Sequence, residues 1–336
     1  MLPFLRRSTA IGLLLALGAA RTTGAQPEPP PPTEIPPANE VLAPLVVPEF
    51  EPLPVSSWLE AQVELHRRGF SCGSIDGVRG AQTVGALHAF QRSAGLRESG
   101  ELDQSTREAL LLTAPALTSH TFTAEELGQL QPVPATWLGK SEQSALGYAT
   151  AVEMIGERYH ASPSFLRQQN PTLNWDSILP GEIITVPAVE RPMIAGHAAR
   201  LHVHLAANEL EATDDTGRII AHFPVSIARM VEKRPVGELT VTVVIPNPDY
   251  TFNPEVFPES AEAQELGRKL ILPPGPNNPV GLAWIGLDRP GYGIHGTPEP
   301  EKVGRTESHG CFRLANWDAL TLLELAWVGL PVVVEP

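Results

Sequence analysis

One of the two cysteines in this 336-residue chain, Cys311, lies within the sequence TESHGCFR (residues 306–313). Sixteen residues before it, His295 ends a short apolar run and Gly296 follows. A cysteine nucleophile needs a nearby base that generates its thiolate, and the base needs a third group that holds it in one tautomer. His295 is a candidate base, and the backbone carbonyl of Gly296 is a candidate orienting group. Spacing alone leaves open that both side chains are ordinary core residues.

Cysteine and histidine also form disulfides and metal sites. A bridge between Cys72 and Cys311 would suit an oxidising compartment, but the two residues fall in segments of different character, so we expect Cys72 to be a packed small residue. His202 and His204 alternate along a predicted strand and therefore share one face. Because no third ligand follows them at a spacing typical of zinc sites, we expect an exposed strand face and no bound metal.

These residues belong to a strand-rich region that begins near Ala198. The segments RLHVHLAANELEAT, GRIIAHFPVSI and GELTVTVVIPNP have the patterns typical of strands. After the cysteine, Asn316 is predicted to cap a helix that has Asp318 in its first turn and reaches Gly329, and Pro331 is predicted to begin a final strand. We expect this helix to brace the loop that carries the cysteine.

A series of short motifs extends over residues 277–334. In chain order they are YGIHGT, Val303-Gly304, SHGCFRL, Asn316, Asp318 and a closing GLPV. With the earlier FPVSIA and RPVGEL, they make this part of the chain resemble the catalytic domain of L,D-transpeptidases, also called the YkuD domain. The resemblance implies a mainly-β catalytic domain over residues 198–336, and a cysteine acyltransferase that needs no metal and no organic cofactor.

The same resemblance implies roles for the residues of the motifs. It makes Cys311 the nucleophile, His295 the general base and acid, and the Gly296 carbonyl the group that orients His295. A loop of three residues is implied to shape the oxyanion site, where backbone N–H groups stabilise the charge of the tetrahedral intermediate. These three residues are Ser308, His309 and Gly310.

The roles of Arg313 and Tyr292 each remain open between two interpretations. Arg313 falls on the arginine of the motif, where its guanidinium would bind a substrate carboxylate; the alternative is a buried pair with a carboxylate such as Asp318. Tyr292 either lines the cleft or packs in the core.

The implied reaction acts on the stem peptides of peptidoglycan. Cys311 attacks the carbonyl that precedes the terminal D-alanine of a stem tetrapeptide, and an amine on a neighbouring stem then takes the acyl group, which gives a 3–3 cross-link in cell-wall remodelling. Three alternatives remain. If water takes the acyl group, the protein is an L,D-carboxypeptidase. If a lipoprotein takes it, the protein is a lipoprotein-anchoring transpeptidase. If Cys311 is inert, the protein is a non-catalytic wall-binding protein.

The N-terminus is predicted to be an export signal and a spacer. Residues 1–25 have arginines at positions 6 and 7, an apolar run over 10–20 and a small-residue cleavage site. The run is shorter than the roughly 20 residues of a spanning helix. Residues 26–54 follow as a linker in which 11 of the last 28 residues are proline, which predicts an extended chain. We expect an exported protein in the periplasm or on the cell wall, without stable membrane insertion after signal cleavage.

Residues 55–114 are predicted to form a small three-helix bundle. Ser56 or Ser57 is expected to cap a helix with Phe70 on its apolar side, Thr83 to cap a second helix, and Ser105 or Thr106 to begin a third. The framework RRGF…DG…G…T…A…FQ…GL…G…T…L resembles the peptidoglycan-binding type 1 domain.

Residues 120–190 are predicted to form a small α/β module. Val152, Ile155 and Tyr159 give one apolar helix stripe, Ser162 is expected to cap a second helix, and GEIITVP is typical of a short strand. This helix–helix–strand order resembles a LysM module, a fold that grips glycan strands. A structural spacer domain is the alternative.

The predicted regions together make a multidomain α+β protein, and its net charge limits the partners it can bind. The formal net charge is −14, and removal of residues 1–25, which contain three arginines and no acidic residue, would make it −17. A surface of that charge repels nucleic acid, so we expect no nucleic-acid partner. The expected partners are the stem peptides and glycan strands of peptidoglycan.

Overall fold

The computed structural model of the protein describes residues 50–257, 260–305 and 310–336. The predicted export signal (residues 1–25) and residues 26–49 of the predicted linker lie outside these ranges, as do Ser308 and His309. All described residues belong to one compact unit. None of the helices found in them is both long and apolar enough to cross a bilayer.

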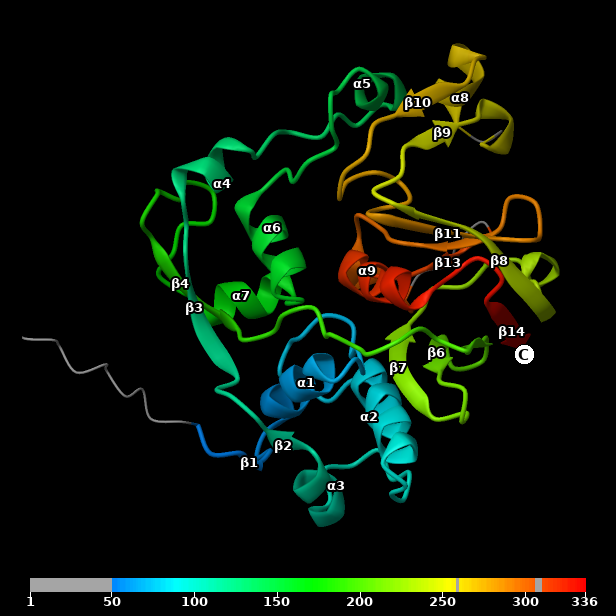
Figure 1. The fold of residues 1–336 in the computed structure, drawn as a ribbon. Coiled ribbons are helices and arrows are strands. Elements are labelled where there is room, and N and C mark those ends of the chain that lie inside the picture. The colour runs from blue at the N-terminus through cyan, green and yellow to red at the C-terminus, as the bar shows by residue number, and fades with distance from the viewer. Residues whose placement is uncertain (1–49, 258–259, 306–309) are drawn as a thin grey trace, which may run out of the picture. The chain divides into compact units, whose positions relative to one another are not determined.

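Three helices and a short strand pair form the first region of the chain (Figure 1). Ser57 begins the first helix, because its side chain accepts the N–H of Glu60 while the Glu60 carboxylate accepts the N–H of Ser57. The end of the predicted linker, residues 53–54, forms one of the two strands and so belongs to this region. The elements are β1 (Leu53–Pro54), α1 (Trp58–Arg67), α2 (Ala81–Ser93), α3 (Gln104–Ala109) and β2 (Leu111–Leu112).

The predicted helix starts at Thr83 and at Ser105 or Thr106 are wrong. The second helix, α2, begins after Gly80, which has no side chain to cap it. Thr83 lies inside the first turn and is buried. The third helix, α3, is capped by Asp103, whose carboxylate accepts the N–H of Thr106 at 2.9 Å. Aspartate caps a helix as effectively as serine does, and Asp103 precedes both Ser105 and Thr106 in the chain.

Phe70 does not extend the apolar side of α1 as predicted. The chain leaves the helix at Gly69, which has a φ of +85°, a conformation that favours glycine. Phe70 then forms a bridge with His222 and packs with Cys72 in the core of the first region. Cys72 is buried there, as expected of a packed small residue.

The second region has an antiparallel strand pair, two short helices and, after these, the two predicted helices. Ser162 caps the second of these helices by accepting the N–H of Phe165, as predicted. Tyr159, predicted in the apolar stripe, follows the end of the first helix and is half-buried. The sequence analysis missed β3, α4 and α5. The elements are β3 (Leu117–Thr121), α4 (Ala124–Gly128), α5 (Trp137–Ser141), α6 (Ala151–Arg158), α7 (Pro163–Gln169) and β4 (Ile183–Pro187).

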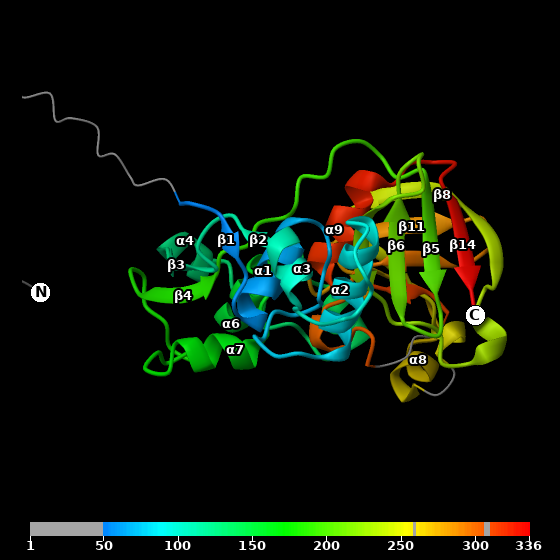
Figure 2. The ribbon, with the colours of Figure 1, turned by 90° about the horizontal axis from the view of Figure 1, so that it is seen from below.

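An eight-stranded mixed sheet dominates the C-terminal region, in agreement with the predicted mainly-β domain (Figure 2). Its strand order is β13-β12-β11-β8-β14-β5-β6-β7. Neighbours are antiparallel except for β14 with β5 and β12 with β13. The strands are β5 (Arg200–His204), β6 (Glu209–Thr213), β7 (Ile219–Pro224), β8 (Gly237–Pro246), β11 (Ala283–Leu287), β12 (Gly293–His295), β13 (Phe312–Arg313) and β14 (Pro331–Glu335).

The helix after the cysteine, α9 (Asn316–Leu325), packs on this sheet through Ala319, Leu322 and Leu325. Two predicted details are wrong: its N-cap is Ala315, and it ends well before Gly329. After the helix, Trp327 donates its indole N–H to the carbonyl of Ala198 at 2.8 Å.

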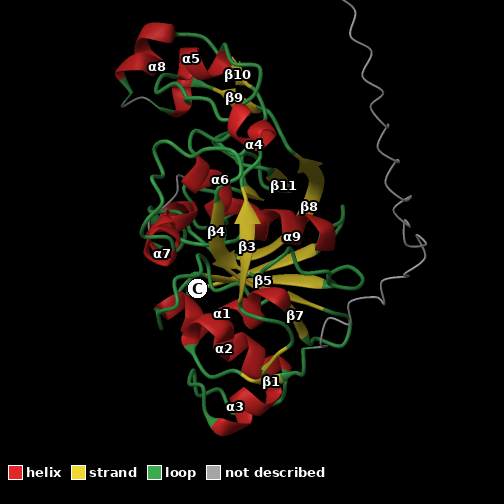
Figure 3. Cartoon of the chain, turned by 90° about the vertical axis from the view of Figure 1, so that its left-hand side faces the viewer, coloured by secondary structure: helices red, strands yellow, loops and turns green. Residues whose placement is uncertain are grey.

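A smaller lobe lies beside the sheet. It contains β9 (Tyr250–Phe252), α8 (Ala261–Leu266) and β10 (Leu270–Leu272), and α5 of the second region lies against them in both views (Figures 1 and 3). Trp137 and Leu138 of α5 share one apolar cluster with this lobe. Part of the second region is therefore built into the C-terminal region.

Candidate active site

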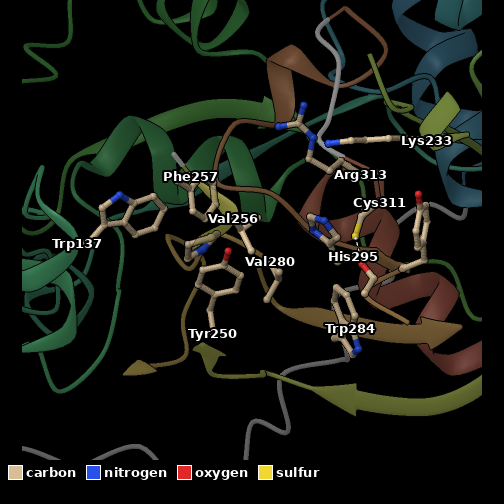
Figure 4. A pocket seen from close by; sticks show the side chains of 14 residues that line it. Trp137, Lys233, Tyr250, Val256, Phe257, Val280, Trp284, His295, Cys311 and Arg313 are labelled. Carbon is tan, nitrogen blue, oxygen red and sulfur yellow. Dashed lines mark hydrogen bonds between the residues drawn. The ribbon is translucent and has the colours of Figure 1, made fainter. Parts of the chain in front are cut away.

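A cavity of about 560 Å³ opens beside β12 and β13 (Figure 4). Five residues singled out in the sequence line it, namely Tyr292, His295, Gly310, Cys311 and Arg313. The sequence analysis missed the other lining residues, which are Trp137, Lys233, Tyr250, Val256, Phe257, Pro279, Val280, Trp284 and Gly291.

His295 is held in one orientation by its own strand. It ends β12, is paired with Trp284 of β11, and stacks on that indole with ring centroids 5.7 Å apart. Its Nδ1 lies 2.6 Å from the carbonyl oxygen of Gly296, so the hydrogen bond requires a proton on Nδ1. The neutral imidazole then has an unprotonated Nε2, which is the atom that can accept a proton.

Pairing of β12 with β13 brings Cys311 to His295. The two strands are parallel, with Ile294 opposite Phe312, and Cys311 immediately precedes Phe312. The thiol donates to the carbonyl of Gly291 at 3.5 Å. Figure 4 shows the Cys311 and His295 side chains next to each other at the cavity wall. Residues 295 and 311 therefore share one site.

Burial favours the uncharged forms of both groups. It lowers the pKa of His295 to about 4; the Gly296 bond opposes this effect and the positive charge of Arg313 adds to it. Burial raises the pKa of the Cys311 thiol, against a backbone hydrogen bond at Gly293 and the charge of Arg313. The expected thiolate is therefore not the resting state at neutral pH. The unprotonated Nε2 is thus the group of His295 that can accept a proton in this cavity.

Arg313 faces the cavity and does not pair with Asp318. The Asp318 carboxylate instead accepts the Ser71 hydroxyl at 3.0 Å. In Figure 4 the Arg313 and Lys233 side chains lie on the same side of the cavity. Asp318 is therefore not the carboxylate of the predicted alternative, and Arg313 and Lys233 place two cationic side chains on this side of the cavity.

Tyr292 lines the cavity next to Gly310. A Cβ on Gly310 would lie 3.6 Å from the Tyr292 ring, and the guanidinium of Arg289 lies 4.5 Å from the centroid of that ring. Of the predicted oxyanion loop only Gly310 is among the described residues, since Ser308 and His309 are not.

Asn316 links the Gly296 peptide to the second region. Its Oδ1 accepts the N–H of Leu282 at 3.1 Å and lies so close to Gly296 that an added Cβ would approach it to 2.2 Å. Its Nδ2 donates to Oε1 of Glu157 on α6 at 3.0 Å. Burial raises the pKa of Glu157 to about 8. No sequence signal marked Glu157, because only the tertiary fold brings α6 to α9.

The other candidate residues lie away from the cavity. Cys72 and Cys311 are not joined by a disulfide. His202 and His204 share one face with nearly parallel rings, but both are half-buried rather than exposed, and His204 lies 3.4 Å from Glu211 and 3.2 Å from Glu335. In the described ranges, no group of three or more His, Cys, Asp or Glu residues is arranged to hold a metal ion.

Comparison with known proteins identifies the family of the chain. The family model of the L,D-transpeptidase catalytic domain (YkuD) matches residues 198–334, and that of a putative peptidoglycan binding domain matches residues 55–110. The putative L,D-transpeptidase YqjB of Bacillus subtilis is 32% identical over 137 residues, which are 39% of this chain and 68% of that protein. The putative L,D-transpeptidase YkuD of Bacillus licheniformis is 25% identical over 185 residues, 55% of this chain and 93% of that protein. A solved structure of L,D-transpeptidase 3 from Mycobacterium tuberculosis aligns with 48% of this chain and 77% of its own, at 18% identity and a TM-score of 0.33. The chain belongs to the L,D-transpeptidase family.

Proposed function

We propose that Cys311 is the nucleophile of the acyl transfer, that His295 is its base and acid, and that the Gly296 carbonyl orients His295. The observation that carries this proposal is the 2.6 Å hydrogen bond from His295 Nδ1 to Gly296. It places the only proton of the neutral ring on Nδ1, and Nε2 is left as the acceptor in the cavity that His295 and Cys311 both line.

The proposed reaction has two half-reactions. The Cys311 sulfur attacks the carbonyl that precedes the terminal D-alanine of a stem tetrapeptide, and its proton passes to His295. The C–N bond breaks as His295 returns that proton to the departing D-alanine, which leaves a thioester on Cys311. The amine of a neighbouring stem then attacks the thioester and loses a proton to His295. The C–S bond breaks, the sulfur regains the proton, and the two stems are joined by a 3–3 cross-link.

Backbone and cationic groups around the thiol are proposed to stabilise the reacting chains. The N–H groups of the loop of Ser308, His309 and Gly310 would hold the oxyanion, at typically about 3 kcal/mol for each donor. Arg313 would bind the carboxylate of the stem peptide, since with Lys233 it gives one side of the cavity a positive charge. Tyr292 would form the wall beside the bound peptide.

The N-terminal regions are proposed to hold the enzyme on its substrate. Residues 55–114 would bind peptidoglycan, and residues 120–190 would form the LysM-like module that grips glycan strands. The family match over residues 55–110 supports the first role, and the helices α6 and α7 followed by β4 support the second. Binding by either module raises the concentration of stem peptides near the catalytic domain, residues 198–336. With the predicted export signal, the enzyme would work in the periplasm or on the cell wall.

Covalent labelling tests the proposed nucleophile. A carbapenem acylates a reactive cysteine of this kind, so we expect mass spectrometry of the full chain to detect one adduct on the wild type and none on C311A. An adduct that persists in C311A, or no adduct on a wild-type protein that still binds cell walls, would refute the role of Cys311. The second result would favour the non-catalytic wall-binding alternative.

The products from a purified stem tetrapeptide identify the acceptor. Release of D-alanine with formation of a cross-linked dimer supports the transpeptidase. Tripeptide as the sole product, with an acceptor amine present, would favour the L,D-carboxypeptidase, and transfer to a lipoprotein alone would favour the anchoring reaction.

A further inference from the structure

One wall of the catalytic cavity comes from outside the part of the chain that matches the catalytic domain. Trp137 lines the cavity together with Cys311, yet it is the first residue of α5 in the second region. The matched ranges, 55–110 and 198–334, both exclude it. Figure 4 shows Val256 and Phe257 between Trp137 and His295, and we call the part of the cavity lined by Trp137, Val256 and Phe257 its arm.

Hydrogen bonds fix the Trp137 segment to the catalytic region. The N–H of Leu138 donates to the Glu262 carboxylate on α8 at 3.1 Å. Further along, the N–H of Leu146 donates to the carbonyl of Pro274 at 2.9 Å, and its carbonyl accepts the N–H of Asn277 at 3.0 Å. The segment is thus held within α5 and again after it, so its place at the cavity is part of the fold.

Packing holds the Trp137 ring rigidly. It stacks on Phe252 with centroids 4.5 Å apart and an interplanar angle of 18°, and Phe257 is 5.5 Å away. The ammonium of Lys140 lies 5.5 Å from the centroid of the same ring. A ring fixed in this way offers the cavity a constant apolar wall, which favours a ligand of matching shape and low polarity.

The two sides of the cavity suit different chemical groups. The cations Arg313 and Lys233 favour a carboxylate on one side, whereas Trp137, Val256 and Phe257 favour hydrocarbon on the other. An acceptor amine must be uncharged when it attacks the thioester. The face of Trp137 contacts the ammonium of Lys140, and the apolar side chains beside it can cover methylene groups, so this end of the cavity accommodates an alkyl amine. The arm is therefore suited to an aliphatic chain that ends in an amine.

We propose that Trp137 is a specificity-determining residue, which binds the hydrocarbon chain of the acceptor amine in the arm it forms with Val256 and Phe257. This inference rests on the proposed function, because it assumes a thioester on Cys311 that an amine then attacks. It gives the second region a direct part in the choice of substrate, in addition to wall binding.

The test compares two acceptors in the full chain, with a stem tetrapeptide as the acyl donor. Nα-acetyl-lysine carries its amine on four methylene groups, and Nα-acetyl-diaminopropionate carries it on one. We expect the wild type to prefer the longer acceptor. In W137A, kcat/KM for the longer acceptor should fall about tenfold through KM, the effect of losing contact with one or two methylene groups. For the shorter acceptor, kcat/KM of W137A should differ from the wild-type value by less than twofold. W137F should recover most of the preference for the longer acceptor. Acylation of Cys311 by a carbapenem should be as fast in W137A as in the wild type.

L138A is the matched control, because Leu138 packs in the same apolar cluster without lining the cavity. It should keep the preference for the longer acceptor. The inference is wrong if W137A affects both acceptors equally, if it slows acylation as much as transfer, or if L138A reproduces its loss. If the wild type forms no thioester at all, the proposed function fails and this inference fails with it. A thioester that forms normally in W137A, with the acceptor preference retained, refutes the inference alone.

Discussion

Replacement of Glu157 by glutamine should make the protein more stable at high pH. The Glu157 carboxyl is buried and accepts a hydrogen bond from Asn316 Nδ2 at 3.0 Å. Burial is the largest cause of its raised pKa; the Asn316 bond opposes it, and the charges of Glu153 and Asp318 add to it. Glutamine keeps an oxygen that accepts the same bond and never ionises. E157Q therefore reproduces the protonated form at every pH.

The sign and size of the effect follow from proton linkage. An unfolded chain releases this proton near pH 4.5, whereas the folded protein keeps it until about pH 8. Between these values the unfolded state binds fewer protons, so the free energy of unfolding decreases as the pH rises. The difference between these two pKa values corresponds to about 5 kcal/mol in the free energy of unfolding, because each pH unit corresponds to about 1.36 kcal/mol. The stabilisation of E157Q relative to wild type should grow by up to about this amount between pH 4.5 and pH 9, mostly below pH 8.

Urea denaturation at pH 5, 7 and 9, followed by tryptophan fluorescence, measures this difference. Buried groups that do not interact with Glu157 titrate in both proteins, so their contributions cancel in the comparison, whereas the charge of Asp318 is already part of the raised pKa of Glu157. E125Q is the matched control, because Glu125 is an exposed carboxylate on α4, and its stability should follow that of the wild type at each pH. If the stability of E157Q also follows the wild type from pH 5 to 9 within about 1 kcal/mol, then the carboxyl is not held protonated by the fold and the reasoning is refuted.

Four further predictions concern the site and the neighbouring Asn316. Alkylation of Cys311 by iodoacetamide should still be accelerating at pH 9, because burial raises the thiol pKa; a plateau near pH 7 would indicate a preformed thiolate. H295A should lower the rate of acyl transfer at least about 100-fold and leave alkylation at pH 9 nearly unchanged, since His295 is uncharged there. R313A should raise KM about tenfold for a donor peptide with a free carboxylate but not for its amide, and equal effects on both would exclude carboxylate binding. N316A should lower the free energy of unfolding by about 3 kcal/mol in urea titrations, because the buried N–H of Leu282 and the Glu157 carboxyl lose their partner.

That His295 and Cys311 share one site was predictable, because their positions depend on local sequence. His295 and Gly296 are adjacent, so the bond between them needs only one turn of the backbone. Cys311 comes to His295 by the pairing of two strands whose motifs the sequence displays in order. The capping residues Ser57 and Ser162 were predictable for the same reason, since each bonds to an N–H three residues ahead.

Predictions failed where a distant group competed for a side chain. Asn316 has the right type and position for an N-cap, but its amide makes hydrogen bonds to Leu282 and Glu157 instead. Asp318 lies five residues from Arg313, yet its carboxylate bonds to Ser71 of the first region. No local pattern encodes either partner, because both depend on how the three regions pack.

The helix α9 shows why the regions work as one protein. It was expected to brace the catalytic loop, and two of its side chains, Asn316 and Asp318, obtain their hydrogen bonds from Glu157 of the second region and Ser71 of the first. Both are buried, so without these partners they would leave polar atoms unsatisfied in the core, at a cost of about 1–3 kcal/mol each. Since Asn316 also abuts Gly296, whose carbonyl holds His295, the N-terminal regions stabilise the peptide that orients the proposed base. The packing of the three regions is therefore part of what holds the proposed site together, separately from the wall binding proposed for the N-terminal regions.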